Sequence, residues 1–171
     1  MAGTAAPAPE GAFVISHRFD APRPRLWSAW TEPDQLSRWF GPRGVTTTLL
    51  RHELRPGGLV HARMERPEGG PIWARFLYRE VLAPQRLVWE HSFADERGEV
   101  ARAPFFDGVW PLRMLTTVTF AEEGAATGVT LTWSPLDATE AERRSFAGNT
   151  ASMTQGWSGS FATLEAYLAA G

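Results

Sequence analysis

The sequence contains no cysteine, and its seventeen basic side chains are all arginine because lysine is absent as well. Without cysteine there are no disulfides, thiolate nucleophiles or thiolate metal ligands. Without lysine there is no Schiff-base chemistry and no P-loop lysine. The formal net charge of −2 comes from interspersed acids and bases, so the charge pattern indicates neither nucleic acid nor an anionic membrane as a partner.

Long apolar runs are absent too. No stretch approaches the ~18 uninterrupted apolar residues of a membrane span, and the N-terminus lacks the apolar run of a signal peptide. Residues 1–11 are rich in alanine, proline and glycine, which predicts a disordered tail. Residues 12–171 are enough for one domain with a sizeable core. We therefore expect a single cytoplasmic domain that needs no cofactor and no metal.

Hydrophobic alternation predicts a sheet. Phe13–Phe19 alternates with period two, as a half-buried strand does, and prolines at positions 22 and 33 begin two short helices after it. Six further strand-like runs are separated by short turns rich in glycine or proline, which favours sequential antiparallel hairpins. These runs are residues 45–54, 59–65, 72–81, 86–93, 112–120 and 129–134.

One connection is too long for a hairpin. Residues 94–111 carry Phe105, Phe106 and Trp110, and with Trp39 these rings are expected at the mouth of any cavity. The segment is either a mobile lid or a fixed plug, and the sequence does not decide between the two.

The C-terminal segment is predicted to be helical. Apolar residues recur at three- and four-residue steps in a long helix from about residue 150 to residue 169. Asp137 and Glu140 have the spacing of a capping box for a shorter preceding helix, and Gly148 with the next residue separates the two. Gly156 either lets the helix approach the sheet closely or leaves room beside Trp157. The expected fold is α+β, with a seven-stranded curved antiparallel sheet wrapped around the long helix.

Five ordered motifs resemble the bacterial relatives of the heat-shock protein 90 ATPase activator, within the START-like, or SRPBCC, superfamily. They are the run from Phe13 to Trp30, Ser37-Arg38-Trp39-Phe40-Gly41-Pro42, Glu53-Leu54-Arg55-Pro56-Gly57-Gly58, the run from Val81 to Val88, and Gly156-Trp157. The resemblance implies a helix-grip fold, in which the sheet and the long helix enclose a cavity. It does not choose a function, because the superfamily includes carriers, aromatic polyketide cyclases and co-chaperone domains.

Strand parity, combined with this resemblance, predicts a cavity wall of aromatic and thioether side chains with a few polar points. The competing interpretation is that the same rings form a packed core. Parity leaves the facing of the fourth strand undecided. The predicted ligand-binding residues are His17, Phe19, Trp39, Met64, Trp89, His91, Trp110, Met114, Thr116, Trp133, Met153 and Trp157.

His17 and His91 are the candidates for chemistry, since imidazole can bind or protonate a carbonyl or hydroxyl near neutral pH. In the family that the chain resembles, these positions more usually hold arginine and an aromatic residue. Each is alternatively a structural histidine that donates to a backbone carbonyl. His52 and His61 are expected at the surface, and the four histidines lack the spacing of a metal site.

We therefore expect the chain to bind a small hydrophobic molecule, aromatic or lipid-like, in an internal cavity. One alternative is a cavity-based enzyme of the polyketide cyclase or dehydratase type, in which His17 and His91 would be the catalytic candidates. The other is a partner-binding module like a co-chaperone. An outward edge strand is compatible with a homodimer.

Overall fold

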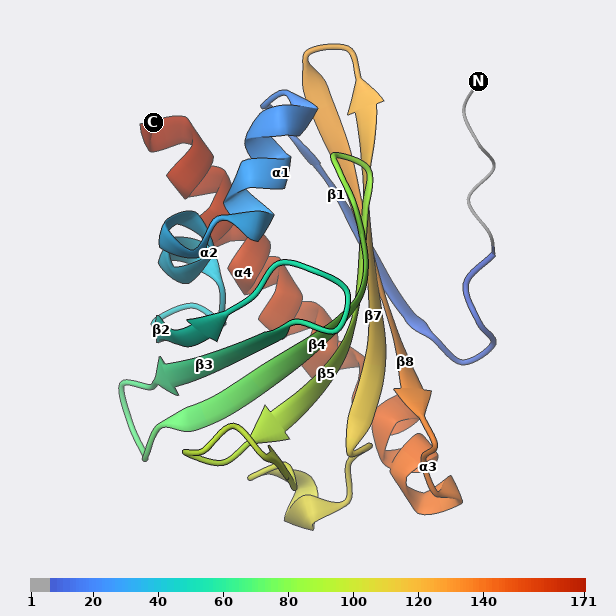
Figure 1. The fold of residues 1–171 in the computed structure, drawn as a ribbon. Coiled ribbons are helices and arrows are strands. Elements are labelled where there is room, and N and C mark those ends of the chain that lie inside the picture. The colour runs from blue at the N-terminus through green and yellow to red at the C-terminus, as the bar shows by residue number, and fades with distance from the viewer. Residues whose placement is uncertain (1–6) are drawn as a thin grey trace.

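A curved antiparallel sheet grips a long C-terminal helix in the computed structural model, which describes residues 7–171 (Figure 1). The strands are β1 (Phe13–Phe19), β2 (Thr46–His52), β3 (Leu59–Glu65), β4 (Ile72–Leu82), β5 (Arg86–Ala94), β6 (Val100–Ala101), β7 (Arg113–Glu123) and β8 (Ala126–Leu136). The helices are α1 (Arg23–Thr31), α2 (Pro33–Trp39), the 3₁₀ turn η1 (Phe106–Gly108), α3 (Glu140–Gly148) and α4 (Thr150–Ala170). The predicted helix-grip fold is confirmed.

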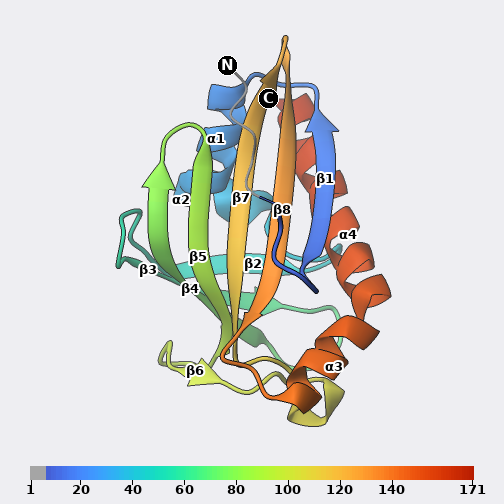
Figure 2. The ribbon, with the colours of Figure 1, turned by 90° about the vertical axis from the view of Figure 1, so that its right-hand side faces the viewer.

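The eight-stranded sheet has the order β1-β8-β7-β5-β4-β3-β2, and β6 pairs with β5 outside this path. Every pairing is antiparallel, so β2 to β8 form the predicted meander. The first strand then closes the order by pairing with the last one, with Phe13 opposite Trp133. Figure 2 shows β1 beside β8, and α4 running along that edge of the sheet.

Helix α4 lies in the concave side of the sheet because one of its faces is apolar and buried. Its buried apolar residues are Met153, Trp157, Phe161 and Leu164. Helices α1 and α2 lie beside α4 at one end of the sheet, and α3, β6 and η1 lie at the other (Figures 1 and 2). Among residues 7–171, no helix is long and apolar enough to cross a membrane. The tail predicted over residues 1–11 falls partly outside the described residues.

The capping box of α3 differs from the predicted one. Thr139, not Asp137, is the N-cap: its side chain accepts a hydrogen bond from the Glu142 amide (3.1 Å), and the Glu142 carboxylate accepts one from the Thr139 amide (3.0 Å). Asp137 instead has a left-handed backbone (φ 48°), so the chain is still turning there. The predicted break between the helices is confirmed, since α3 ends at Gly148.

The fourth strand could not be assigned from parity because it contains a β-bulge. The register of β4 against β5 shifts between Tyr78 and Glu80. Even-numbered residues therefore face the core before the bulge, and odd-numbered residues face it after the bulge. Phe76 and Tyr78 are buried in the core before it, whereas Val81 packs against the core after it. Both halves of the conflicting pattern are therefore explained. The short strand β6, within residues 94–111, was not predicted.

The packed core is densest at the α1–α2 end. Trp30 lies at its centre: its ring contacts Trp39 (centroids 4.6 Å apart) and Phe120 (5.9 Å), and it stacks on Trp157 (6.2 Å). Trp39 donates its indole N–H to the Ala29 carbonyl (2.8 Å), which fixes α2 against α1. Large rings therefore fill this end of the space between sheet and helix.

Candidate functional site: a cavity between the sheet and α4

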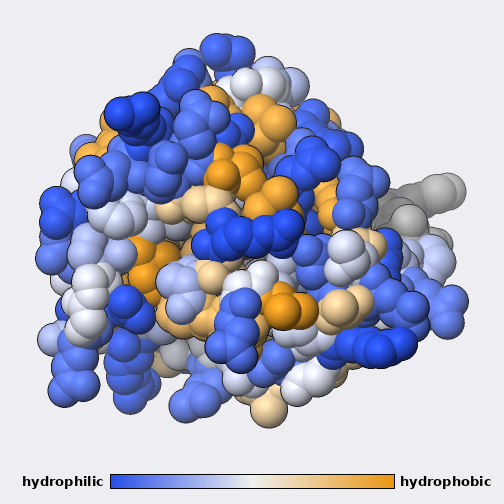
Figure 3. Space-filling view, turned by 90° about the horizontal axis from the view of Figure 1, so that it is seen from below, coloured by the Kyte–Doolittle hydropathy of each residue, from blue (hydrophilic) through white to orange (hydrophobic). Residues whose placement is uncertain are grey.

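The other end of that space is a cavity of about 660 Å³. Its wall is mostly apolar, and the residues come from β3, β4, β5, β7, β8 and α4, and from the loops between them. Figure 3 looks at this end of the molecule and shows hydrophobic side chains gathered near the middle of the face among hydrophilic ones. The lining residues are Phe40, Gly41, Pro42, Arg43, Val45, Met64, Arg66, Pro67, Glu68, Ile72, Ala74, His91, Phe93, Phe105, Phe106, Trp110, Met114, Trp133, Asn149, Ser152, Met153, Gly156, Trp157 and Ser160.

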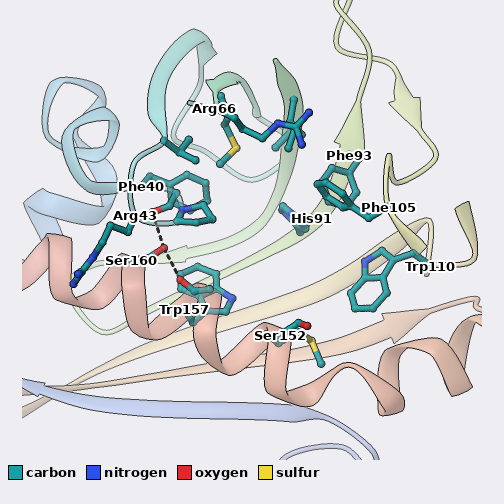
Figure 4. Close-up of a pocket in the computed structure, with 18 of the residues that line it drawn as sticks. Phe40, Arg43, Arg66, His91, Phe93, Phe105, Trp110, Ser152, Trp157 and Ser160 are labelled. Carbon is teal, nitrogen blue, oxygen red and sulfur yellow. Dashed lines mark hydrogen bonds between the residues drawn. The ribbon is translucent and has the colours of Figure 1, made fainter. Parts of the chain in front are cut away.

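One side of the cavity is the loop that follows α2, and two hydroxyl groups fix it. The Thr47 hydroxyl donates to the Phe40 carbonyl (2.5 Å), and the Ser160 hydroxyl of α4 donates to the Gly41 carbonyl (2.9 Å) (Figure 4). Gly41 has a positive φ of 116°, and a side chain there would press against Met64 and Thr47. The loop is therefore held against both β2 and α4.

Gly156 explains why the cavity reaches α4. A Cβ atom at this position would meet nothing within 4 Å, so close packing does not require the glycine. The sequence left two roles for Gly156, close approach of the helix to the sheet or room beside Trp157. The structure supports the second role, because both residues line the cavity.

The segment 94–111 forms the far side of the cavity. Phe105 packs against Phe93 (ring centroids 5.7 Å apart), and Phe106 stacks on Trp110 (4.9 Å). The Arg66 guanidinium lies over the Phe105 ring at 5.8 Å. These contacts make the segment part of the wall, while its motion, as lid or as plug, stays a prediction.

A further ion pair links this segment to α3. Arg102 donates to the Glu142 carboxylate (2.7 Å), which also belongs to the capping box. The hydrogen bond from the Thr139 amide, followed by that from Arg102, holds the pKa of Glu142 below its usual value. The pair therefore ties the middle of the segment to the start of α3.

His91 is the ionisable side chain of the inner wall. Its ring stacks on Trp133 (centroids 5.3 Å apart, planes at 21°) and packs against Phe76 (5.6 Å). Burial lowers the pKa of His91 from 6.5 to about 4, so the imidazole is neutral at physiological pH. Figure 4 shows it at the back of the cavity, facing the space in front of α4.

The structure brings together more than half of the predicted binding residues. Those that line the cavity are Met64, His91, Trp110, Met114, Trp133, Met153 and Trp157. Sequence reasoning did not select the loop after α2 or the rim residues Arg66, Glu68 and Ser152, because their positions depend on how the loops fold. The sequence placed Phe105 and Phe106 at the mouth of a cavity and suggested room beside Gly156. All three residues line the cavity.

The other predicted residues lie away from the cavity. Phe19, Trp39, Trp89 and Thr116 face inward but belong to the packed end of the core, where the rings around Trp30 leave no space. His17 lies near the outer part of α4, with its Nε2 atom 3.6 Å from a carboxylate oxygen of Glu165. None of these five residues lines the cavity.

The histidines expected at the surface differ from each other. His52 is half-buried, whereas His61 is buried on the outer face of the sheet, where its Nε2 atom hydrogen-bonds the Asp95 carbonyl (3.0 Å). The surface prediction for His61 is therefore wrong, because the turn after β5 covers it. Within residues 7–171, no group of three or more His, Asp or Glu side chains could hold a metal ion.

Fold and site together define a START-like helix-grip protein with a cavity at one end. More particularly, the chain belongs to the Activator of Hsp90 ATPase homolog 1-like protein family, whose pattern matches residues 20–169. No curated protein matches the chain.

Solved structures similar to this chain come from several bacteria. A protein from Arthrobacter aurescens is 26% identical, with a TM-score of 0.77 over 94% of this chain and 87% of that one. One from Mycobacterium smegmatis is 25% identical, with a TM-score of 0.73 over 92% and 90%. One from Rhodobacter sphaeroides is 21% identical, with a TM-score of 0.75 over 96% and 97%, and this likeness shows the fold alone.

Proposed function

We propose that this chain binds a small, largely apolar molecule in the cavity beneath α4. The observation that carries the proposal is the cavity itself, which measures about 660 Å³ and is walled by aromatic rings and methionines. Ligand pockets typically enclose about 300–1,000 Å³ with this kind of lining. Protein interiors are otherwise close-packed, whereas the apolar side chains that line this space lack such contacts on one side. A bound molecule would restore the missing contacts.

Gly156 supports the same conclusion independently. Glycine inside a helix costs about 1 kcal/mol relative to alanine. Because a Cβ atom would meet no neighbour here, close packing does not explain why a glycine is present. A need for space beside a bound ligand would explain it.

The proposal can be tested with 1-N-phenylnaphthylamine, an uncharged dye whose fluorescence rises in apolar surroundings. We expect the protein to bind it with saturable fluorescence, and Gly156→Leu to weaken binding at least tenfold because the new side chain projects into the cavity. Gly148→Leu is the matched control, since Gly148 also has open space around its Cβ position but does not line the cavity. Absence of saturable binding, or equal affinity in both variants, would contradict the proposal.

Conversion of the bound molecule is the second candidate function, and one observation favours it. The His91 imidazole is neutral and reaches the cavity, so it could accept a proton from a bound hydroxyl or donate a hydrogen bond to a bound carbonyl. If the ligand that co-purifies with the protein is chemically changed over time, His91→Phe should bind it and leave it unchanged. Unchanged ligand with the unaltered protein would leave binding as the function.

A further inference from the structure

The interior of the cavity offers more side-chain hydrogen-bond donors than acceptors. His91, Trp110 and Trp157 all line it, and each is more than nine-tenths buried. None of these rings forms a hydrogen bond with another described residue, whereas the Trp39 indole does. Figure 4 shows the rings on different sides of the same space, since they come from β5, the 94–111 segment and α4.

The interior acceptors are few. The Ser160 hydroxyl donates its hydrogen to the Gly41 carbonyl, and its oxygen remains able to accept one. Neutral His91 contributes one N–H group and one acceptor nitrogen. The other side-chain oxygens of the lining, those of Glu68, Asn149 and Ser152, belong to exposed or half-buried residues at the rim, where water can pair with them.

The donors are also held in place by packing. His91 is stacked on Trp133, and Trp110 packs against Phe146 (ring centroids 5.5 Å apart). Trp157 meets the Trp133 ring at 5.5 Å with the planes at 80°. Fixed rings present their N–H groups without a further loss of side-chain entropy when a ligand binds.

Charge is disfavoured inside the cavity. Two cations, Arg43 and Arg66, belong to the lining, and both are at the rim. Arg43 is exposed, and half-buried Arg66 donates to the Gly70 carbonyl (2.8 and 3.0 Å) and lies over Phe105. The interior wall therefore contains no paired charge that could compensate for burying a carboxylate or an ammonium group. A neutral oxygen acceptor, in contrast, would meet N–H groups that have no partner among the described residues. The indole N–H of Trp133, another lining residue, is buried without a partner, which is itself costly.

We propose that the occupant is a planar aromatic carbonyl compound, such as an aromatic ketone or quinone, whose rings lie against the aromatic wall and whose carbonyl oxygen accepts from His91, Trp110 or Trp157. This inference rests on the proposed function and adds the chemical class of the ligand. Aromatic rings suit the wall because the lining contains rings on opposite sides. A carbonyl suits the donors because it accepts hydrogen bonds and donates none.

Three probes of nearly identical shape test this inference: 9-fluorenone carries a carbonyl, 9-fluorenol a hydroxyl, and fluorene neither. Each would be titrated against protein saturated with 1-N-phenylnaphthylamine, and displacement would give its affinity. We expect fluorenone to bind at least tenfold more tightly than fluorene, and fluorenol to lie between them. The tenfold preference should fall to less than threefold in at least one of His91→Phe, Trp110→Phe and Trp157→Phe.

Each variant keeps an aromatic ring at its position, and retained binding of the dye shows that the cavity is intact. The inference is overturned if fluorene binds as tightly as fluorenone, or if the preference survives in all of the variants that still bind the dye. These results leave the proposed function standing. Failure of the unaltered protein to bind the dye or any probe overturns the proposed function, and this inference with it.

Discussion

His91 is a titratable side chain enclosed by rings, and this placement makes the stability of the protein depend on pH. Its neighbours Phe76, Phe93 and Trp133 shield it from water, so the charged form is penalised. Apolar burial is the whole cause of the lowered pKa, because no hydrogen bond or charge opposes it. The same shielding keeps the imidazole neutral toward any ligand.

The consequence is a loss of stability at acid pH. In the unfolded chain His91 takes up a proton near its ordinary pKa of 6.5, whereas in the folded chain it does so only near 4. Above pH 6.5 both states are neutral and the full stability is present; as the pH falls toward 4, the unfolded state binds the extra proton and is favoured. The free energy of unfolding should fall by up to about 3 kcal/mol from this group.

The measurement is urea unfolding between pH 7 and pH 4 for the unaltered protein and for His91→Phe. Carboxylates titrate in both, so their effect cancels in the difference between the two curves. The variant should show the shallower pH dependence. Parallel curves would show that His91 does not carry this linkage.

Among the elements, α3 shows how a local sequence signal chooses between nearby residues. Asp137 and Glu140 have the capping spacing, but Thr139 and Glu142 have it too, and the structure uses the second pair. Thr139 has the extended backbone of an N-cap (φ −70°, ψ 164°), whereas Asp137 is left-handed and pairs with Arg113 (3.2 Å). Spacing alone could not separate them, because both pairs satisfy the same rule.

Substitution of the N-cap should therefore lower stability at Thr139 and not at Asp137. Thr139→Ala should lower the free energy of unfolding by about 1 kcal/mol, because the Glu142 amide loses its partner. Thr139→Ser keeps the hydroxyl and should stay close to the unaltered protein. Asp137→Asn, which tolerates the left-handed backbone, should change stability by less than about 0.5 kcal/mol. Urea unfolding distinguishes these outcomes, and an equal loss in Thr139→Ala and Asp137→Asn would refute the assignment.

Strand elements were predicted better than the position of the cavity. The alternation in β1 and β5 identified the inward face correctly, since period-two parity follows directly from strand geometry. Parity does not report how far along the sheet a residue lies from the helices that fill the interior. Phe19 and Trp89 face the same way as Met114, yet only Met114 reaches the cavity, because α1 and α2 bring Trp30 and its neighbours against the former two.

At the scale of the whole molecule, the space between sheet and α4 has a packed end and an open end. Large rings around Trp30 fill the end near α1 and α2, while the end near α3 and the 94–111 segment encloses the cavity. The packed end supplies the stability that a protein with an internal cavity requires. The two ends should therefore respond differently to the same substitution.

Phe120 and Phe40 allow a matched comparison, because both are phenylalanines with less than a tenth of their surface exposed. Phe120 packs against Trp27 and Trp30 in the filled end, so Phe120→Ala should create a new cavity and cost about 3–5 kcal/mol. Phe40 packs against Phe76 and Trp157 but also lines the existing cavity, so Phe40→Ala widens that space instead of opening a new one and should cost clearly less. Urea unfolding of the ligand-free protein would compare the two, with far-UV circular dichroism as the check on folding. Equal losses would mean that Phe40 is packed as tightly as Phe120, and that the open end is filled by side chains rather than available to a ligand.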